Sequence, residues 1–173
     1  MQNIHADAYL EPFPHLVFHN FYSDDELELI WEELKFYTKP NKLFDVEDYD
    51  GVVGYTKAKA IALDTVYTQK NRVLSNILEV TRKVFDKQVL EPFSDLHDCL
   101  TLAKFANYDV TKVRYYHNTD YYKPHTDTLF EFLAFSYFYR EPKKFDGGNL
   151  IFPKYNYEFS CDNNSLIMFN PSG

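Results

Sequence analysis

The chain has 173 residues, of which 18% are aromatic, and it carries 18 Lys and Arg against 26 Asp and Glu, a net charge of −8. This length is typical of one domain, and the negative balance excludes a basic module that binds nucleic acid through general electrostatics. The apolar runs are shorter than the roughly 18 residues of a membrane span, and the first residues lack a basic-then-apolar signal segment. We therefore expect a cytoplasmic protein with an aromatic-rich core and no membrane partner.

No repeat or flexible linker interrupts the sequence, which we interpret as a single domain over residues 1–173. Residues 1–99 are expected to be mainly helical support with N-terminal strands, and residues 100–173 to hold the strands of the core. The two cysteines, Cys99 and Cys161, lie far apart and in no metal-type spacing. Both are therefore expected to be reduced thiols in the core.

Two helices are predicted in the first half of the chain. The first spans Ser23 to Lys35, because Ser23 and Glu26 form a capping box before apolar residues at helical spacing. These apolar residues are Leu27, Ile30, Trp31 and Leu34. The second helix is predicted from about Lys70 to Asp86, where apolar residues keep a helical period between polar positions.

Six short strands are predicted after residue 100, because Thr, Val, Tyr and Phe dominate short runs separated by turn-forming clusters. The strands are Lys112 to His117, Tyr121 to Thr126, Phe130 to Tyr139, Asn149 to Phe152, Tyr157 to Ser160 and Ser165 to Phe169. The turns are Asn118–Asp120, Asp146–Gly148 and Cys161–Asn164. Both alternating faces of Phe130 to Tyr139 are apolar, so we expect that strand to lie centrally with both faces covered. This pattern favours a sandwich or a barrel.

The sharpest chemical signal is His125-Thr126-Asp127 within the second predicted strand. Residues two apart on a strand point to the same side, so an imidazole and a carboxylate are expected side by side. One His and one carboxylate, completed by a second His, form the facial triad that leaves open positions on non-haem Fe(II). His125 and Asp127 are therefore the candidate metal ligands and catalytic residues.

The sequence around this pair resembles the Fe(II)- and 2-oxoglutarate-dependent oxygenase superfamily, and most closely its prolyl-4-hydroxylase-like branch. The resemblance is carried by Arg114–Asp127, Phe138–Pro142 and Phe145–Leu150, and it is densest from Asn107 to Phe169. The segment Phe18–Glu26 is similar to that branch's entry into its first helix. The resemblance implies an α+β fold: a double-stranded β-helix (jelly-roll) core with N-terminal supporting helices.

The resemblance also implies roles for single residues. His125 and Asp127 would bind Fe(II), Tyr115 would hydrogen-bond 2-oxoglutarate, and Tyr122 would line the same pocket. The implied reaction hydroxylates a prolyl residue of a peptide, or a related small substrate, with molecular oxygen, while 2-oxoglutarate is oxidatively decarboxylated to succinate. Ascorbate is a candidate accessory cofactor in this scheme.

The sequence departs from the family after Phe169. The family's distal histidine and the Arg or Lys that pairs with 2-oxoglutarate are absent before the last residue, Gly173. His117 is expected to be a turn residue, and His97 and His19 lie in connecting or edge segments. We therefore expect a β-helix that is incomplete at its C-terminal end, with weak metal binding, little turnover, and open sheet edges that could pair with another chain.

Two other functions remain open. One is a non-catalytic β-helix binding module that keeps His125 and Asp127 without a complete iron site. The other is a cupin-like metal enzyme that does not use 2-oxoglutarate, a class that shares the barrel but usually carries more histidines.

Overall fold

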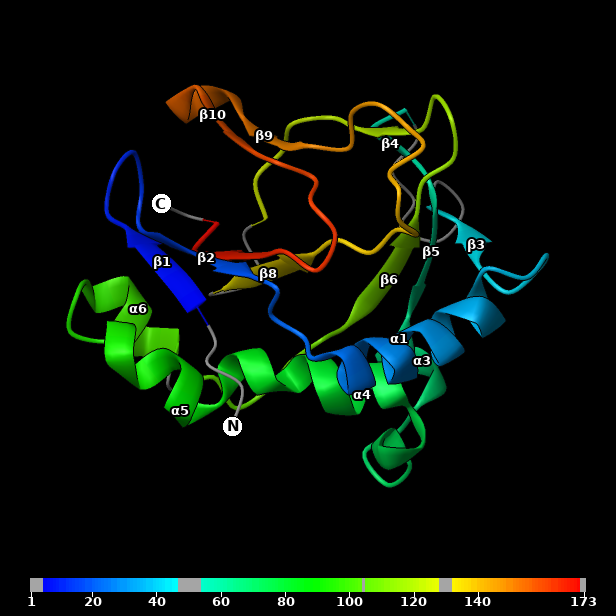
Figure 1. Ribbon diagram of the computed structural model, residues 1–173, viewed down its shortest axis with the longest axis horizontal. Coiled ribbons are helices and arrows are strands. Elements are labelled where there is room, and N and C mark those ends of the chain that lie inside the picture. Colours follow the sequence, from blue (N-terminus) through cyan, green and yellow to red (C-terminus); the bar gives the residue numbers. More distant parts are fainter. Residues whose placement is uncertain (1–4, 47–53, 104, 128–131, 172–173) are drawn as a thin grey trace. The chain divides into compact units, whose positions relative to one another are not determined.

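The computed structural model describes residues 5–46, 54–103, 105–127 and 132–171 (Figure 1). The chain is mixed α and β, its paired strands are antiparallel, and the described strands form no closed barrel. It divides into two compact units. Unit 1 contains Met1–Ser23, Val84–Ala106 and Pro124–Gly173, and unit 2 contains Asp24–Lys83 and Asn107–Lys123. Because both units draw on both halves of the chain, one domain over residues 1–173 stays a prediction.

The main sheet of unit 1 joins segments that are far apart in the sequence. Its strands, in hydrogen-bonded order, are β1 (His5–Tyr9), β2 (His15–His19), β11 (Leu166–Phe169) and β8 (Leu133–Ser136). All of β11 and the first four residues of β2 are buried, since each strand has a neighbour on both edges and mostly apolar side chains on both faces. β2 and β11 therefore form the centre of this sheet.

A hairpin adds aromatic side chains to the core of unit 1. β9 (Leu150–Phe152) and β10 (Tyr157–Phe159) pair across the short turn η4 (Pro153–Tyr155). The buried cluster consists of Phe13, Val17, Phe159, Ile167 and Phe169, and Phe135, Phe152 and Tyr157 pack against it. The helical segments of this unit are α5 (Lys87–Leu90), η3 (Glu91–Phe93) and α6 (Asp98–Ala103). The aromatic-rich core expected from the composition is thus confirmed.

One predicted strand has a different place from the one expected. The central position predicted for the strand within Phe130 to Tyr139 is wrong, because β8 lies at the edge of the described sheet and Ala134 is exposed. Residues 130 and 131 lie outside the described residues. An apolar pattern reveals which side chains can be covered, but it does not reveal how many neighbouring strands form hydrogen bonds.

The predicted turn at Asp146–Gly148 is confirmed by its backbone. Gly147 and Gly148 have φ of +80° and +88°, a region that favours glycine. A Cβ atom at Gly148 would lie 3.1 Å from the Sγ atom of Cys161.

Cys161 is a buried free thiol, as predicted, and burial raises its pKa. The side chain of Cys99 lies outside the described residues.

The side chain of Asn164, in the turn before β11, forms hydrogen bonds with the segment that follows β2. Its Oδ1 accepts a hydrogen bond from the N–H of Tyr22 (2.9 Å), and its Nδ2 donates to the carbonyl of Tyr22 (2.8 Å). Asn164 is buried and has φ of +59°, a left-handed conformation that Asn tolerates better than most residues. One side chain thus satisfies two backbone groups 142 residues away.

We expect Asn164→Ala to lower the free energy of unfolding of this chain by about 2–4 kcal/mol, because it removes two buried hydrogen bonds to the backbone of Tyr22 and keeps a strained backbone. Urea denaturation measures this loss. The matched control is Asn163→Ala, which removes one hydrogen bond, from the N–H of Tyr139 to Oδ1 (3.1 Å), and should cost about 1 kcal/mol. Equal losses in the two variants would contradict the role of Asn164.

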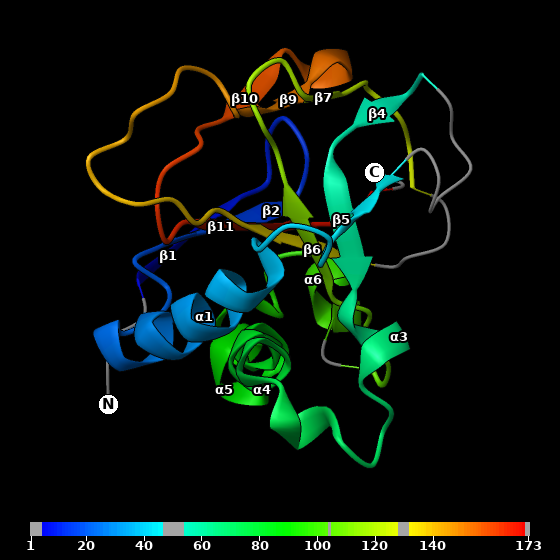
Figure 2. The ribbon, with the colours of Figure 1, turned by 90° about the vertical axis from the view of Figure 1, so that its right-hand side faces the viewer.

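Unit 2 combines helices with two small sheets. Its helical segments are α1 (Asp24–Tyr37), α3 (Leu63–Val66), η1 (Arg72–Leu74) and α4 (Asn76–Thr81), and α1 packs against α4 (Figure 2). The sheets are β3 (Phe44–Asp45), β5 (Lys59–Ala62) and β6 (Lys112–Tyr115), and the ribbon of β4 (Thr56–Lys57) and β7 (Tyr121–Tyr122). The consecutive strands β6 and β7 therefore form no hairpin. Among the described helices, none combines the length and apolar composition that crossing a bilayer requires.

The first predicted helix is confirmed as α1, but the single helix predicted from Lys70 to Asp86 is wrong. That segment forms η1, α4 and η2 (Arg82–Phe85). Ser75 causes the break: its backbone is extended and its Oγ accepts a hydrogen bond from the N–H of Leu78 (3.1 Å) as the N-cap of α4. The hydroxyl of Ser75 in turn donates to Glu33 of α1 (2.8 Å). This contact between helices stabilises a new helix start inside the predicted one.

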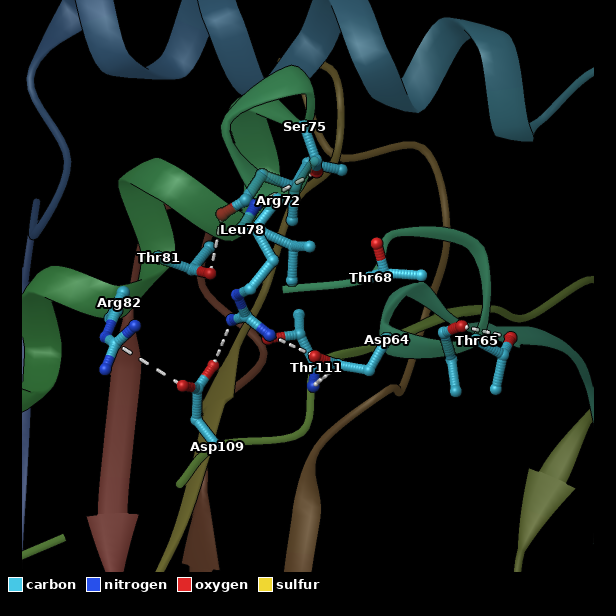
Figure 3. Close-up of polar contacts among 12 residues, drawn as sticks. Asp64, Thr65, Thr68, Arg72, Ser75, Leu78, Thr81, Arg82, Asp109 and Thr111 are labelled. Carbon is cyan, nitrogen blue, oxygen red and sulfur yellow. Dashed lines mark hydrogen bonds and ion pairs between the residues drawn. The ribbon is translucent and has the colours of Figure 1, made fainter. Parts of the chain in front are cut away.

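A buried arginine joins three segments of unit 2 (Figure 3). Arg72 pairs with Asp64 of α3 and, at 2.6 Å, with Asp109, while its own side chain is only 12% exposed. Asp64 also accepts a hydrogen bond from the N–H of Thr111 (2.8 Å). Arg82 reaches Asp109 more loosely, at 3.9 Å, and is 56% exposed. The guanidinium of Arg72 therefore holds the segment before β6 against α3 and η1.

We expect Arg72→Met to lower the free energy of unfolding by about 2–4 kcal/mol, because it removes the close cation of two largely buried carboxylates and leaves only the loose contact of Arg82 with one of them. Arg82→Met is the matched control and should cost less than about 1 kcal/mol, since exposed ion pairs contribute little. Thermal or urea unfolding of both variants measures the difference. Similar losses would show that the buried ion pairs of Arg72 do not stabilise unit 2.

Candidate functional site

The candidate metal ligands come together at the start of the last segment of unit 1. The Nε2 atom of His125 lies 3.5 Å from Oδ2 of Asp127, and the side chains are 30% and 34% exposed. Two atoms that bind one metal ion at right angles, each at about 2.1 Å, lie roughly 3 Å apart. The pair therefore fits two neighbouring positions around a single metal ion, and solvent can reach both groups.

These two residues do not lie on a strand, so the strand predicted from Tyr121 to Thr126 is too long. β7 ends at Tyr122, and residues 123–127 have no regular secondary structure. Pro124 gives the reason, because proline has no N–H to donate to a neighbouring strand. His125 and Asp127 approach each other in an irregular segment rather than through strand alternation.

A second histidine does not complete the triad among the described residues, where no group of three His, Cys, Asp or Glu side chains could hold a metal ion. Three other histidines have partners of their own. His15 is enclosed in the core, and His19 lies 3.6 Å from Asp7. Asp120 accepts a hydrogen bond from the N–H of His117 (2.8 Å), which confirms the turn role expected of His117.

The two tyrosines of the predicted site belong to unit 2. Tyr115 ends β6, is exposed, and its ring contacts that of His117 edge-on at 4.6 Å. Tyr122 lies on β7, and the guanidinium of Arg114 stands 4.7 Å from the centre of its ring. Both side chains are thus on the surface of unit 2, while His125 and Asp127 are described with unit 1.

The structure adds Arg114 and Tyr116 to the surroundings of Tyr122. Burial raises the pKa of Tyr116, although the ring of this residue is partly exposed. The nearby charge of Arg114 opposes this rise. Sequence analysis gave neither residue a role. Strand alternation gave no signal for this pair, because Tyr116 lies just beyond the end of β6.

His15 is a histidine that the structure excludes as a metal ligand. Its side chain is fully buried, with Nδ1 2.8 Å from the carbonyl oxygen of Phe13 and Nε2 3.0 Å from the hydroxyl of Tyr157. The ring also stacks on Tyr9 at 4.9 Å. Both nitrogens therefore have partners when the ring is neutral, and burial lowers the pKa of His15 even though the contact with Phe13 acts in the opposite direction.

The depressed pKa of His15 makes the stability of the chain depend on pH. Because the folded-state pKa lies below the unfolded value of about 6.5, the unfolded chain binds more protons, and folding weakens as pH falls through this range. We expect His15→Phe to show a smaller loss of unfolding free energy than wild type between about pH 7 and about pH 5 in urea denaturation. His19→Ala, at an exposed site, is the control. An unchanged pH slope in His15→Phe would contradict this account.

Unit 2 also contains an open surface pocket of about 330 Å³. It is lined by Glu32, Glu33, Phe36, Tyr67, Leu74 and Asn76. Close by, Tyr37 donates a hydrogen bond to the hydroxyl of Tyr67 (3.3 Å), and burial raises the pKa of Tyr37. None of the four predicted site residues lines this pocket. His125 and Asp127 therefore remain the candidate site.

Comparisons of the chain with protein-family models, with curated proteins and with solved structures give no match. The resemblance to the oxygenases therefore rests on the segments between Arg114 and Leu150 and on Phe18–Glu26.

Proposed function

We propose that this chain is an Fe(II)- and 2-oxoglutarate-dependent dioxygenase of the prolyl-4-hydroxylase-like branch, acting on a prolyl residue of a peptide or on a related small substrate. The observation that carries this proposal is the 3.5 Å approach of His125 to Asp127. An imidazole and a carboxylate are two of the three donors of the facial triad. When bound, Fe(II) supplies the oxidising chemistry that couples decarboxylation of 2-oxoglutarate to hydroxylation of a C–H bond.

In this proposal the residues of the chain hold and orient the reactants. His125 binds the metal through a neutral ring nitrogen, and the carboxylate of Asp127 offsets part of the metal's charge. The resemblance assigns Tyr115 a hydrogen bond from its hydroxyl to 2-oxoglutarate, and it assigns Tyr122 to the lining around that cosubstrate. The exposure of both tyrosines supports these roles, because neither ring is used to fill the core.

We also propose that the antiparallel sheets belong to a double-stranded β-helix. The placement of the consecutive strands β6 and β7 in separate sheets supports this fold, because the resemblance assigns them to opposing sheets. A cytoplasmic location is part of the same proposal, and the buried free thiol of Cys161 supports it.

Anaerobic calorimetric titration with Fe(II) tests the proposed ligands. We expect His125→Ala and Asp127→Ala each to weaken Fe(II) binding more than about tenfold, because each removes one of the two identified donors. The matched control is His19→Ala, since among the three described His–Asp pairs of similar separation that of His19 and Asp7, at 3.6 Å, lies outside the segment around His125. This control should bind Fe(II) as wild type does.

Two results would contradict or redirect the proposal. Equal Fe(II) affinity in wild type and in His125→Ala would contradict it. If the folded wild-type chain binds no Fe(II), the non-catalytic binding module is favoured instead. Succinate formation that Asp127→Ala abolishes would support the enzyme.

A further inference from the structure

The ribbon of β4 and β7, whose backbone is drawn in Figure 2, carries two tyrosines and two lysines on one face. In its register Lys57 faces Tyr121, and the hydrogen bond from the N–H of Lys123 to the carbonyl of Tyr55 (2.9 Å) extends the pairing by one residue. Because alternate residues share a side, these four side chains lie on the same face and Thr56 lies on the other. We call these four residues the Tyr–Lys face.

The Tyr–Lys face is open to solvent. Tyr55 is 50% exposed and Tyr121 is 41% exposed, and the side chain of Lys57 is 56% exposed. Thr56, on the opposite side of the ribbon, is buried, and its Oγ1 donates to the carbonyl of Tyr121 (3.2 Å). The ribbon therefore holds two large aromatic rings at the surface, while Thr56 on its other side is buried.

The lysines of this face contact other side chains within unit 2. The Nζ atom of Lys123 stands 6.0 Å from the ring centre of Tyr55 and 5.8 Å from that of Tyr121. The Nζ atom of Lys57 pairs with Asp120 at 3.1 Å, and the side chain of Asp120 is almost fully buried. Side chains that are already ordered lose less conformational entropy when a ligand binds. The face is thus preorganised for binding.

The charge around this face is opposite to that of the chain. Residues 55–59 and 112–123 contain five cations, Lys57, Lys59, Lys112, Arg114 and Lys123, and one carboxylate, Asp120, while a second carboxylate, Asp45, pairs with Lys59 at 3.0 Å. The whole chain has a net charge of −8, so the positive charge is concentrated on a small part of an acidic protein. Such an asymmetry favours an anionic partner.

We propose that the Tyr–Lys face docks a short acidic peptide segment that carries aromatic or other apolar side chains. Tyrosine rings pack against apolar side chains while their hydroxyls donate hydrogen bonds, and tyrosine is enriched at the centres of protein interfaces. The ammonium groups of Lys57 and Lys123 attract carboxylates. A long nucleic acid is disfavoured, because the rest of the chain is strongly negative and repels a polyanion. The proposal concerns binding alone and does not rest on the iron site.

Fluorescence anisotropy with three labelled probes tests this docking surface on the full chain. The probes are a short peptide rich in Asp and Glu with two phenylalanines, the same peptide with Lys in place of each acidic residue, and a single-stranded oligothymidylate. We expect the acidic peptide to bind best and to bind more weakly at high salt. Lys123→Glu should weaken its binding more than about tenfold, and Tyr121→Ala about fivefold or more.

The matched control is Lys70→Glu, which makes the same charge change in the exposed loop between α3 and η1, at the other end of unit 2 from β4 (Figure 1). It should leave peptide binding unchanged. Lys123→Gln is a second variant, with an expected effect between those of Lys70→Glu and Lys123→Glu, and urea midpoints establish that all variants fold. Equal binding of the acidic and basic peptides, or an effect of Lys70→Glu equal to that of Lys123→Glu, overturns the proposal. Tighter binding of the oligothymidylate overturns it in favour of single-stranded nucleic acid.

Discussion

The pairing of β2 with β11 is the constraint on which unit 1 depends. Ile167 pairs with Val17 and Met168 with Leu16, and these four side chains are buried. Because side chains alternate along a strand, a slip of one residue would move every one of them to the opposite face of the sheet. The two hydrogen bonds of Asn164 to the backbone lie just beyond this pairing and hold the register. The aromatic cluster can pack only once that register is set.

Unit 2 combines buried apolar side chains with polar contacts between its segments. Ile30 of α1, Leu63 of α3 and Leu78 of α4 are buried. Polar side chains also connect these segments, as in the ion pairs of Arg72 and the contact of Glu33 with the cap of α4. Replacing one polar residue should therefore disturb several elements of this unit together.

Local patterns in the sequence predicted some elements correctly. They failed where contacts with distant residues determine the local structure. The capping box predicts α1 because all its parts lie within one turn of the chain. The break at Ser75 could not be predicted, since its partner Glu33 is 42 residues away. At the candidate site, the closeness of His125 and Asp127 was predicted, but for a reason that the structure does not support, because strand β7 ends before Pro124. Two residues separated by one position can meet without regular structure between them.

The same long-range pairing has a consequence for biosynthesis. His15 of β2 pairs with Phe169 of β11, so about 150 residues separate the two halves of the central strand pair. At ribosomal rates of about 5–20 residues per second, β2 waits roughly 8–30 s for that partner. During this interval an apolar strand edge is available for pairing with another chain. The nascent polypeptide therefore passes through an aggregation-prone stage that ends only when β11 has emerged.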